Sequence, residues 1–320
     1  GGVQLRLPKA MGKLTDDGWV QVSGSPDANR PVSLDLVYRS DFPVDRFPQL
    51  PLSVPPPKPV ALSIVPGFDA VRLPLAVDLM PTAMSWDPKG RLFLTSLKGR
   101  VWQGVDTDKD GLEDQVSLFS DELAAPFGIA AHADYVDVIN KYALLRLFDD
   151  NRDGQADRVV TLASGWGHTT DYHDWAIGLP HDKQGNYYIA LACQQDDRSL
   201  AAAKLRGKVV KLVPQTPTPG NPQAYRVQEL TGGHRFPTGI ARNRQGQLFV
   251  TDNQGNYNPF NELNHVVAGA RYGFLNKVER REGFAPPLTP PAIDIPHPWT
   301  RSVNGICFLE TPAKLLAEKA

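Results

Sequence analysis

A strand–turn–strand unit recurs along this chain, and the repeat constrains the fold more than any other feature. Copies begin at Ala83, Gly128, Gly178 and Gly239, and a fifth begins at Asn304 and is cut short. Each copy opens with a small and an aliphatic residue, followed by a strand pattern, a turn and a second strand pattern. Strand-rich repeats of about 40 to 50 residues are typical of β-propeller blades, and longer spacings leave room for inserted loops.

The repeat predicts an all-β fold, an incomplete β-propeller of the six-bladed type with about four and a half blades. Weaker strand patterns supply the outer strands of three blades, at 99–104 with 115–119, 143–148 with 158–162, and 207–213 with 225–230. Since such a set of blades cannot close a ring of six, we expect an open edge. The alternative is a β-sandwich in which the similarity between units is accidental.

Three segments differ in composition. Residues 1–48 alternate hydrophobic and polar residues at 3–7, 19–22 and 32–38, which predicts half-buried strands of a truncated domain. Residues 49–60 are rich in proline and predict a linker, and 61–320 form the partial propeller. The chain starts without Met or a signal-peptide pattern and ends within a helix-prone pattern, so we expect a piece of a longer protein.

The charge and composition exclude several classes of partner. The net charge is −1, and no dense Lys/Arg cluster is present, which argues against nucleic acid and anionic membranes as partners. No apolar run reaches about 18 residues, so no transmembrane segment is expected. The two cysteines, Cys193 and Cys307, cannot form a disulfide scaffold, and no C-x-x-C-H haem motif occurs.

Two acidic loops have the spacing of a Ca²⁺ site. Side-chain oxygens stand at positions 1, 3, 5 and 9 with glycine at position 6, from Asp106, Asp108, Asp110 and Asp114 in one loop and Asp149, Asn151, Asp153 and Asp157 in the other. Neither loop has Glu at position 12, so they resemble short Ca²⁺ loops of the dockerin or thrombospondin type rather than EF-hands. Both join predicted outer strands, which indicates a structural metal. The alternative is a solvated Asp-Gly hairpin turn.

A histidine-rich loop precedes the inner strand of the third blade. It contains His168, Asp171, His173 and Asp174, and in a propeller this connection crosses the face where ligands bind near the axis. A histidine beside carboxylates can serve as a general base, because its pKa lies near neutrality. The alternative is that these side chains cap turns.

A second functional stretch starts at Arg235, beside a Pro-Thr-Gly turn. Its strand patterns lead into a segment rich in Asn, Gly and Pro, 252–264, which we expect to be an exposed functional loop. Oxygen ligands there could hold a hard cation, and Arg235 could pair with an anionic cofactor. The alternative is a turn network of Asn side chains.

Four segments of this stretch carry a family resemblance: R-F-P-T-G-I, Q-L-F-V-T-D-N-Q-G-N, N-E-L-N and A-R-Y-G-F. They resemble the soluble quinoprotein sugar dehydrogenases, six-bladed propellers that use pyrroloquinoline quinone (PQQ) and Ca²⁺. The resemblance covers roughly 61–310 and is closest to large planctomycete-type dehydrogenase-like proteins. It implies that His173, 14 residues before Tyr187-Tyr188, is the catalytic base. It also implies that Arg235 pairs with the cofactor, and that the cofactor's Ca²⁺ is held by backbone carbonyls of the loop containing Gln254, Gly255 and Asn256.

The sequence departs from this family at Phe236, Thr238 and Asn256, where the family has Asn, Gln and Pro. The resemblance implies oxidation of a small sugar or alcohol, a cytochrome-type electron acceptor elsewhere in the full-length protein, and a periplasmic or extracellular location. Two alternatives stay open. One is a lactonase-type metal-dependent hydrolase using Asp252, Asn253 and Glu262. The other is a non-catalytic, Ca²⁺-stabilised propeller that binds glycans or proteins.

Overall fold

The computed structural model describes residues 2–6, 12–14, 20–22, 35–39, 63–64, 70–75 and 79–308, except for 122, 172, 194–198, 219 and 255–259. Contacts divide the chain into two units, Gly1–Lys58 and Pro59–Ala320. In the first unit, β1 (Gly2–Arg6) pairs antiparallel with β4 (Asp35–Arg39), and β2 (Gly12–Leu14) with β3 (Val20–Val22). The predicted linker, 49–60, lies outside the described residues.

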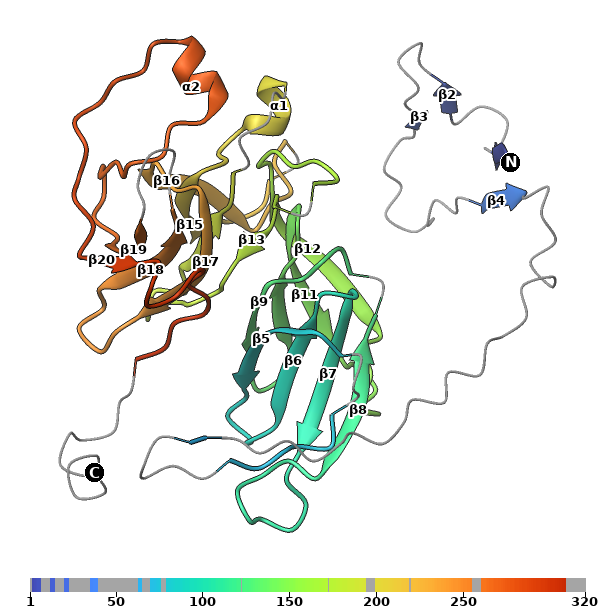
Figure 1. The fold of residues 1–320 in the computed structure, drawn as a ribbon. Helices are drawn as coiled ribbons and strands as arrows, with labels where there is room; N and C mark the ends of the chain where they lie inside the picture. Colours follow the sequence, from blue (N-terminus) through green and yellow to red (C-terminus); the bar gives the residue numbers. More distant parts are fainter. Residues whose placement is uncertain are drawn as a thin grey trace. The chain divides into compact units, whose positions relative to one another are not determined.

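The second unit contains four antiparallel sheets, each of four strands in chain order (Figure 1). Blade 1 comprises β5 (Pro81–Trp86), β6 (Leu92–Ser96), β7 (Arg100–Val105) and β8 (Gln115–Ser120). Blade 2 comprises β9 (Gly128–Ala131), β10 (Val136–Ile139), β11 (Ala143–Phe148) and β12 (Arg158–Ser164). Blade 3 comprises β13 (Ala176–Ile177), β14 (Tyr187–Leu191), β15 (Lys208–Pro214) and β16 (Tyr225–Gly232). Blade 4 comprises β17 (Phe236–Arg242), β18 (Leu248–Asn253), β19 (Phe260–His265) and β20 (Ile293–Pro296).

The first strands of successive blades lie next to one another, as in a propeller. Strand β5 contacts β9, and β13 contacts β17. Between blades 2 and 3, the N–H of Gly178 donates to the carbonyl of Phe127, 3.0 Å away. The four repeated units are therefore the inner strand pairs of four blades, and the predicted incomplete propeller is confirmed.

A shared turn explains why the repeat is visible in the sequence. In three blades the first residue of the turn between the two inner strands accepts backbone N–H groups through its side-chain oxygen, and a glycine follows with φ between +76° and +86°. A positive φ is unfavourable for residues with a Cβ, so glycine is required there. The side-chain acceptors are Asp87, Asp182 and Asn243, and the glycines are Gly90, Gly185 and Gly246.

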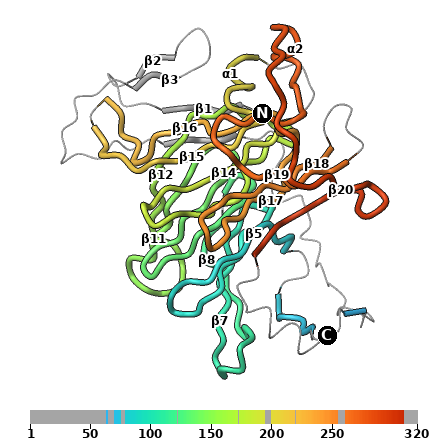
Figure 2. Tube along the Cα trace, turned by 90° about the vertical axis from the view of Figure 1, so that its left-hand side faces the viewer, coloured from blue at the N-terminus to red at the C-terminus, as the bar shows by residue number. Residues whose placement is uncertain are grey.

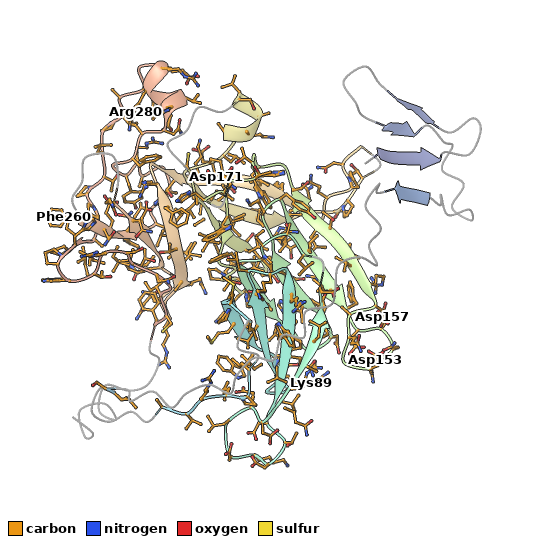
Figure 3. All side chains as sticks on the ribbon, turned by 45° about the vertical axis from the view of Figure 1, so that its right-hand side comes forward. Lys89, Asp153, Asp157, Asp171, Phe260 and Arg280 are labelled. Atoms are coloured by element: carbon orange, nitrogen blue, oxygen red, sulfur yellow. The ribbon has the colours of Figure 1, made fainter. Side chains whose placement is uncertain are left out.

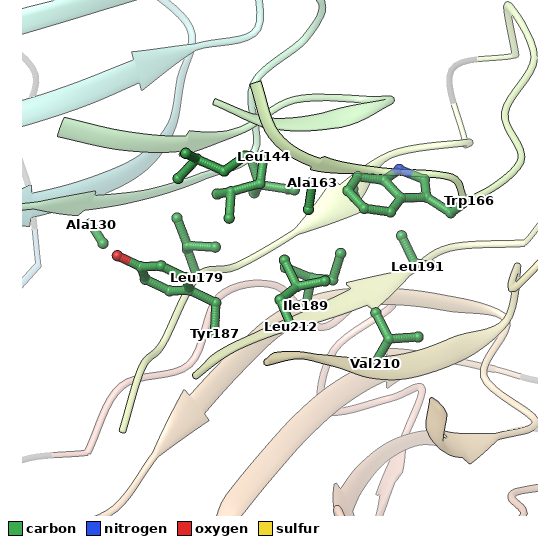
Figure 4. Packing of buried hydrophobic residues seen from close by; sticks show 13 residues of the cluster. Ala130, Leu144, Ala163, Trp166, Leu179, Tyr187, Ile189, Leu191, Val210 and Leu212 are labelled. Carbon is green, nitrogen blue, oxygen red and sulfur yellow. The ribbon is translucent and has the colours of Figure 1, made fainter. Parts of the chain in front are cut away.

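The hydrophobic core lies between neighbouring blades. One cluster joins blades 2 and 3, and its largest buried side chains include Trp166 and Tyr187 with the aliphatic Leu144, Ile189 and Leu212 (Figure 4). Corresponding clusters join blades 1 and 2 and blades 3 and 4. Fully burying one such aliphatic or aromatic side chain contributes about 1.5 to 3 kcal/mol, so the faces of the blades, rather than their edges, hold the unit together.

The fourth blade contains a strand that its sequence did not suggest. Residues 260–264 were expected in an exposed loop, but they belong to β19, and Asn261 and Asn264 are fully buried. The amide of Asn261 donates to the carbonyl of Thr300 (3.0 Å), and that of Asn264 to the Glu262 carboxylate (3.1 Å). Because these hydrogen bonds replace those with water, the polar side chains are tolerated inside.

The fifth unit forms no strand within its described residues, which end at Phe308. It does continue along the first strands of blade 4. The hydroxyl of Thr238 donates to the carbonyl of Val303 (2.9 Å), and that of Thr251 to the carbonyl of Asn304 (2.7 Å). The described part of the propeller thus has four sheets, with the chain beginning to cover the inner edge of the fourth.

The strand order gives each blade two distinct ends. The upper end is the one at which the first strand of each blade begins. The lower end holds the turn between strands one and two and, in blades 1 to 3, the loop between strands three and four. In blade 4 the connection between β19 and β20 runs back to the upper end, where the N–H of Tyr272 donates to the carbonyl of Gly232 (3.0 Å). Helices α1 (Leu200–Ala203) and α2 (Lys277–Arg281) lie at the upper end, and the loop after β7 extends from the lower end (Figure 2). Within the described residues, no helix is long and apolar enough to cross a membrane.

Candidate active site at the upper end of the blades

His173 lies in the connection between β12 and β13, at the upper end. Its backbone N–H donates to Oδ1 of Asp171 (2.7 Å), and its Nδ1 lies 3.0 Å from the same oxygen. Since a carboxylate can only accept, the proton of the neutral imidazole is on Nδ1 and the lone pair is on Nε2. The side chain is 14% exposed. Asp171 therefore orients the ring and sets its tautomer, as an acidic partner does for a general base.

A buried arginine fixes the loop that carries His173. Arg206 is 1% exposed, and its guanidinium donates to the backbone carbonyls of Asp174 and Trp175. Its Nε lies 3.9 Å from the carboxylate of Asp174, which also accepts from the hydroxyl of Thr169 (2.6 Å). Arg206 thus ties together two carbonyls and a nearby carboxylate of the loop.

Lys141, in the turn between β10 and β11, holds the outer side of the same loop. Its ammonium donates to the carbonyls of Thr169 (3.1 Å) and Asp171 (2.6 Å). Burial lowers the pKa of Lys141 below its usual value, and the negative charge of Asp174 partly offsets this effect. Two cations from different blades therefore hold the backbone around His173.

Arg235 and Phe236 are positioned by Asp252, on the neighbouring strand β18. The carboxylate accepts the backbone N–H of Arg235 at Oδ2 (2.9 Å) and that of Phe236 at Oδ1 (2.7 Å), and it is 2% exposed. The guanidinium of Arg235 donates to the carbonyl of Gln254 (3.4 Å). His234 is fully buried, with Nδ1 3.5 Å from Asp252. Arg235 thereby lies against the first residue of the predicted carbonyl loop.

An aromatic contact brings the two predicted clusters together. The ring of Phe236 lies edge-on to that of His173, with centroids 4.9 Å apart, and 5.7 Å from that of Trp175. Trp175 in turn stacks on Phe127 at 4.2 Å. His173, Arg235 and Gln254 consequently lie at the same end of neighbouring blades. Gly255 and Asn256, predicted to hold the cofactor's Ca²⁺, lie outside the described residues.

The side chains considered for a lactonase-type metal site do not point to one place. They are Asp252, Asn253 and Glu262. Asp252 and Glu262 are cross-strand partners of β18 and β19, so their side chains share one face of the sheet. Asn253 follows Asp252 within the strand and points to the other face, where its oxygen accepts from Ser302 (2.9 Å). These three residues therefore do not form one metal site.

The two tyrosines that matched the family interval lie far from His173. Tyr187 begins β14 at the lower end, and its hydroxyl donates to Asp137 (2.6 Å). The hydroxyl of Tyr188 donates to Asp182 (2.8 Å), and burial together with that hydrogen bond raises the pKa of Tyr188 to about 12. The interval matches in sequence spacing, but these hydroxyls hold the lower end of blade 3 and do not assist His173.

The first acidic loop, 106–114, lies at the lower end and places three carboxylates close together. Ligand oxygens of Asp106, Asp108 and Asp114 lie within 4.8 Å of one another, the spacing that a single cation could span. Asp106 also accepts the N–H groups of Lys109 (2.7 Å) and Gly111 (2.9 Å), which fixes the turn. Asp110 accepts instead from the N–H of Leu112 (2.8 Å).

The second acidic loop, 149–157, has the same backbone conformation. Positions 4 and 6 have positive φ in both loops, +64° at Lys109 and at Arg152, and +93° and +88° at Gly111 and Gly154. In the second loop, Asn151 replaces the central carboxylate. Its amide donates to Asp153 (3.1 Å) and Asp157 (3.0 Å), and Asp149 accepts the N–H of Gly154 (3.0 Å). Figure 3 shows Asp153 and Asp157 at the lower end and Asp171 at the upper end.

Reasoning from sequence missed the residues that support this site. Arg206 and Lys141 are distant in sequence from His173, and only the fold brings them to its loop. His234 directly precedes Arg235, yet nothing in the local pattern marks it as buried. The only signal was compositional: each is a potential cation within a strand-rich, apolar context.

Comparison with solved structures defines the class of protein as a β-propeller with the fold of the soluble sugar dehydrogenases. A putative oxidoreductase (glucose dehydrogenase) from Thermus thermophilus is 23% identical, with a TM-score of 0.50 over 68% of this chain and 70% of its own. The PQQ-bound aldose sugar dehydrogenase from Streptomyces coelicolor is 18% identical, with a TM-score of 0.50 over 72% and 71%. A calcium structure of a family AA12 enzyme from Trichoderma reesei is 14% identical, with a TM-score of 0.50 over 62% and 56%.

The family of the chain follows from its sequence. Residues 62–283 match the model of a domain of unknown function, DUF7133, and the chain belongs to this family. No curated protein matches the sequence significantly. At these low identities the solved structures show the fold alone.

Proposed function

We propose that this propeller is a PQQ- and Ca²⁺-dependent oxidoreductase acting on a sugar or alcohol, with His173 as the base. The observation that carries the proposal is the Asp171–His173 pair, fixed at the upper end beside Arg235 and Gln254. A base with a fixed tautomer, next to a cation and a carbonyl-rich loop, fits removal of a hydroxyl proton beside an anionic cofactor.

The chemistry of the donor set supports a cofactor at this place. Arg235 supplies a guanidinium suited to pairing with a carboxylate, and its backbone is held by Asp252 independently of its side chain. The carbonyl of Gln254 is a hard oxygen ligand of the kind that Ca²⁺ prefers, and it is the described end of the loop that would hold the metal. PQQ bound there would act as hydride acceptor for the substrate.

The residues of this chain would then have separate tasks. His173 would accept the hydroxyl proton at Nε2, and the resulting imidazolium would be stabilised by Asp171 at Nδ1. Phe236 limits rotation of the imidazole through their edge contact. Arg206 and Lys141 hold the loop backbone, so the base need not reorganise during the reaction.

The test replaces His173 with glutamine in the full-length protein. With PQQ and Ca²⁺ supplied, we expect His173→Gln to lower dye-linked oxidation of glucose and other aldoses by about 10²- to 10⁴-fold, the range for loss of a general base. PQQ binding, followed by its absorbance, should be unchanged. His168→Gln is the matched control, because His168 is exposed in the same loop; it should retain full activity.

Three outcomes separate the alternatives. Full activity in His173→Gln would refute the assignment of the base. PQQ binding without oxidation of any aldose or alcohol would refute the proposed reaction, and failure to bind PQQ would favour a non-catalytic glycan- or protein-binding propeller. Phe236 stands where the quinoprotein family has Asn, so PQQ binding has to be measured directly.

The proposal extends to the surroundings of the enzyme. A quinone reduced by a sugar must pass its electrons on, so we propose a cytochrome-type acceptor in the full-length protein, and a periplasmic or extracellular location as the resemblance implies. The narrower likeness to planctomycete-type proteins stays a prediction.

A further inference from the structure

Two histidines from neighbouring blades meet at the lower end. His132 directly follows β9 in blade 2, and His181 lies in the connection between β13 and β14 in blade 3. Their ring centroids are 5.6 Å apart, and the ring planes are inclined at 45°. Because His173 lies at the upper end, this pair of imidazoles is separate from the candidate active site.

Hydrogen bonding fixes the tautomer of His132. The hydroxyl of Tyr187 donates its single proton to the carboxylate of Asp137 (2.6 Å), and Nε2 of His132 lies 2.8 Å from the same hydroxyl oxygen. Nε2 therefore carries a proton and donates it to that oxygen, which leaves the lone pair of the neutral ring on Nδ1. Both oxygens of Asp137 are held in turn by Arg146. A histidine that ligates a metal is oriented in the same way, through a hydrogen bond from its other ring nitrogen.

Solvent reaches the nitrogens that remain free. The side chain of His132 is 25% exposed, and His181 is an exposed residue. Within the described part of the chain nothing donates to Nδ1 of His132, yet this atom is not one of the buried nitrogens that lack a partner, so it faces solvent. The exposed ring of His181 can turn to present either of its nitrogens. A small ion can thus approach both rings from outside.

The charges around His132 keep its imidazole neutral. Burial has the largest effect and lowers the pKa of His132, Asp137 raises it, and His181 and Arg146 lower it further. An incoming metal ion therefore need not displace a proton from Nδ1 near pH 7. The positive charge of Arg146 is balanced by Asp137, and its guanidinium lies over the ring of Tyr135, 3.7 Å from the centroid.

The separation of the rings suits two imidazoles on one metal ion. A histidine nitrogen lies about 2.0 to 2.1 Å from Zn²⁺, so two rings on one tetrahedral ion have centroids roughly 5 Å apart. A small rotation of the exposed His181 ring covers the difference from the observed 5.6 Å. Imidazole suits Zn²⁺, Ni²⁺ and Cu²⁺, whereas Ca²⁺ prefers oxygen ligands. Among the described residues no third His, Cys, Asp or Glu joins the pair, so water would fill the other positions.

We propose that His132 and His181 together bind one divalent transition-metal ion of the Zn²⁺, Ni²⁺ or Cu²⁺ class, and that this ion ties blade 2 to blade 3 at the lower end. The site is distinct from the acidic loops, which offer only oxygen ligands. It does not rest on His173 or on any cofactor.

The experiment uses the untagged, full-length protein, stripped of metal with a chelator and then saturated with Ca²⁺. In a titration with Cu²⁺, electron paramagnetic resonance should show coupling to two imidazole nitrogens. Zn²⁺ should displace the copper and raise the melting temperature, because it binds the folded state. His132→Gln and His181→Gln should each abolish the two-nitrogen signal and weaken Zn²⁺ binding by at least tenfold in calorimetry.

Controls separate this site from the rest of the molecule and from folding defects. His181 is exposed, so His181→Gln should fold normally and keeps the test valid even if His132→Gln does not. His168→Gln and His173→Gln remove histidines of the upper end and should leave the two-nitrogen signal and the Zn²⁺ affinity unchanged. The proposal is overturned if the protein binds neither ion, if either lower-end variant binds them as tightly as the unaltered protein, or if an upper-end variant abolishes binding.

Discussion

Gly178, directly after β13 of blade 3, packs against Ile240 in the first strand of blade 4. Its φ is +73°, and a Cβ there would lie 1.9 Å from the Cγ2 of Ile240. Gly178→Ala would combine left-handed strain of about 1 to 2 kcal/mol with overpacking of about 1 to 3 kcal/mol. We therefore expect the free energy of unfolding to fall by about 3 kcal/mol or more, measured by urea denaturation.

Gly185→Ala separates the two contributions. Gly185 has a similar φ of +76°, but its added Cβ would meet only Pro214 at an ordinary 3.7 Å. We expect a loss of only about 1 to 2 kcal/mol, from strain alone. Equal losses in the two variants would show that blades 3 and 4 can separate at this point without cost.

For single residues, the residue type predicted which side chains could take part in chemistry. It did not predict which hydrogen-bond partners hold those side chains in place. His173 stood out because an imidazole beside carboxylates can act as a general base, and Arg235 because a guanidinium can pair with an anionic cofactor. Asp252 was considered as a metal ligand, whereas both of its oxygens accept backbone N–H groups. A carboxylate's partners depend on which strands are neighbours, and this information is absent from local sequence.

The acidic loops belong to the scale of a single element. Three carboxylates within 4.8 Å repel one another, and a bound Ca²⁺ would cancel that repulsion in the folded loop. We therefore propose structural Ca²⁺ in both loops, and expect tighter binding in the loop 106–114, because Asn151 places a neutral amide at the centre of the other. Calcium at 100 times its dissociation constant would stabilise the unit by about 2.7 kcal/mol per site.

Calorimetric titration and thermal melting with Ca²⁺ or a chelator test this expectation. Asp108→Asn should remove most of the Ca²⁺-dependent rise in melting temperature, whereas Asp121→Asn, an exposed acid just after β8, should preserve it. An unchanged melting temperature in chelator, with no heat of Ca²⁺ binding, would mean that both loops are ordinary Asx turns.

The sequence predicted strands correctly where a turn signal and an alternation of hydrophobic and polar residues occur together. Inner hairpins carry a side-chain acceptor and a left-handed glycine in three blades, so the sequence alone located them. Strand β19 lacks this agreement, because its buried Asn261 and Asn264 are polar and depend on tertiary partners such as Thr300. Polar strands of this kind cannot be distinguished from loops before their hydrogen-bond partners are known.

Across the blades, one buried cluster joins blade 2 to blade 3. Asp137, on β10, is fully buried and pairs with both Nε and Nη2 of Arg146 at 2.7 Å. It also accepts from the hydroxyl of Tyr187 in blade 3. Burial and the negative charge of Asp137 raise the pKa of Tyr187 well above its usual range, so the phenol stays a donor. For Arg146, burial lowers the pKa, but the hydrogen bond and charge of Asp137 outweigh this effect.

Removing that carboxylate would leave a partly buried cation and a buried phenol without their acceptor. We expect Asp137→Ala to lower the free energy of unfolding by about 3 to 5 kcal/mol, the range for breaking a buried pair. Asp150→Ala removes the same kind of two-point contact with an arginine, from Arg158, but both side chains are exposed to solvent, so the loss should be far smaller than that of Asp137→Ala. Because Asp137 bonds across the blade boundary, Asp137→Ala should also increase hydrogen exchange in both β10 and β14. Faster exchange in β10 alone would show that the cluster stabilises one blade and does not couple two.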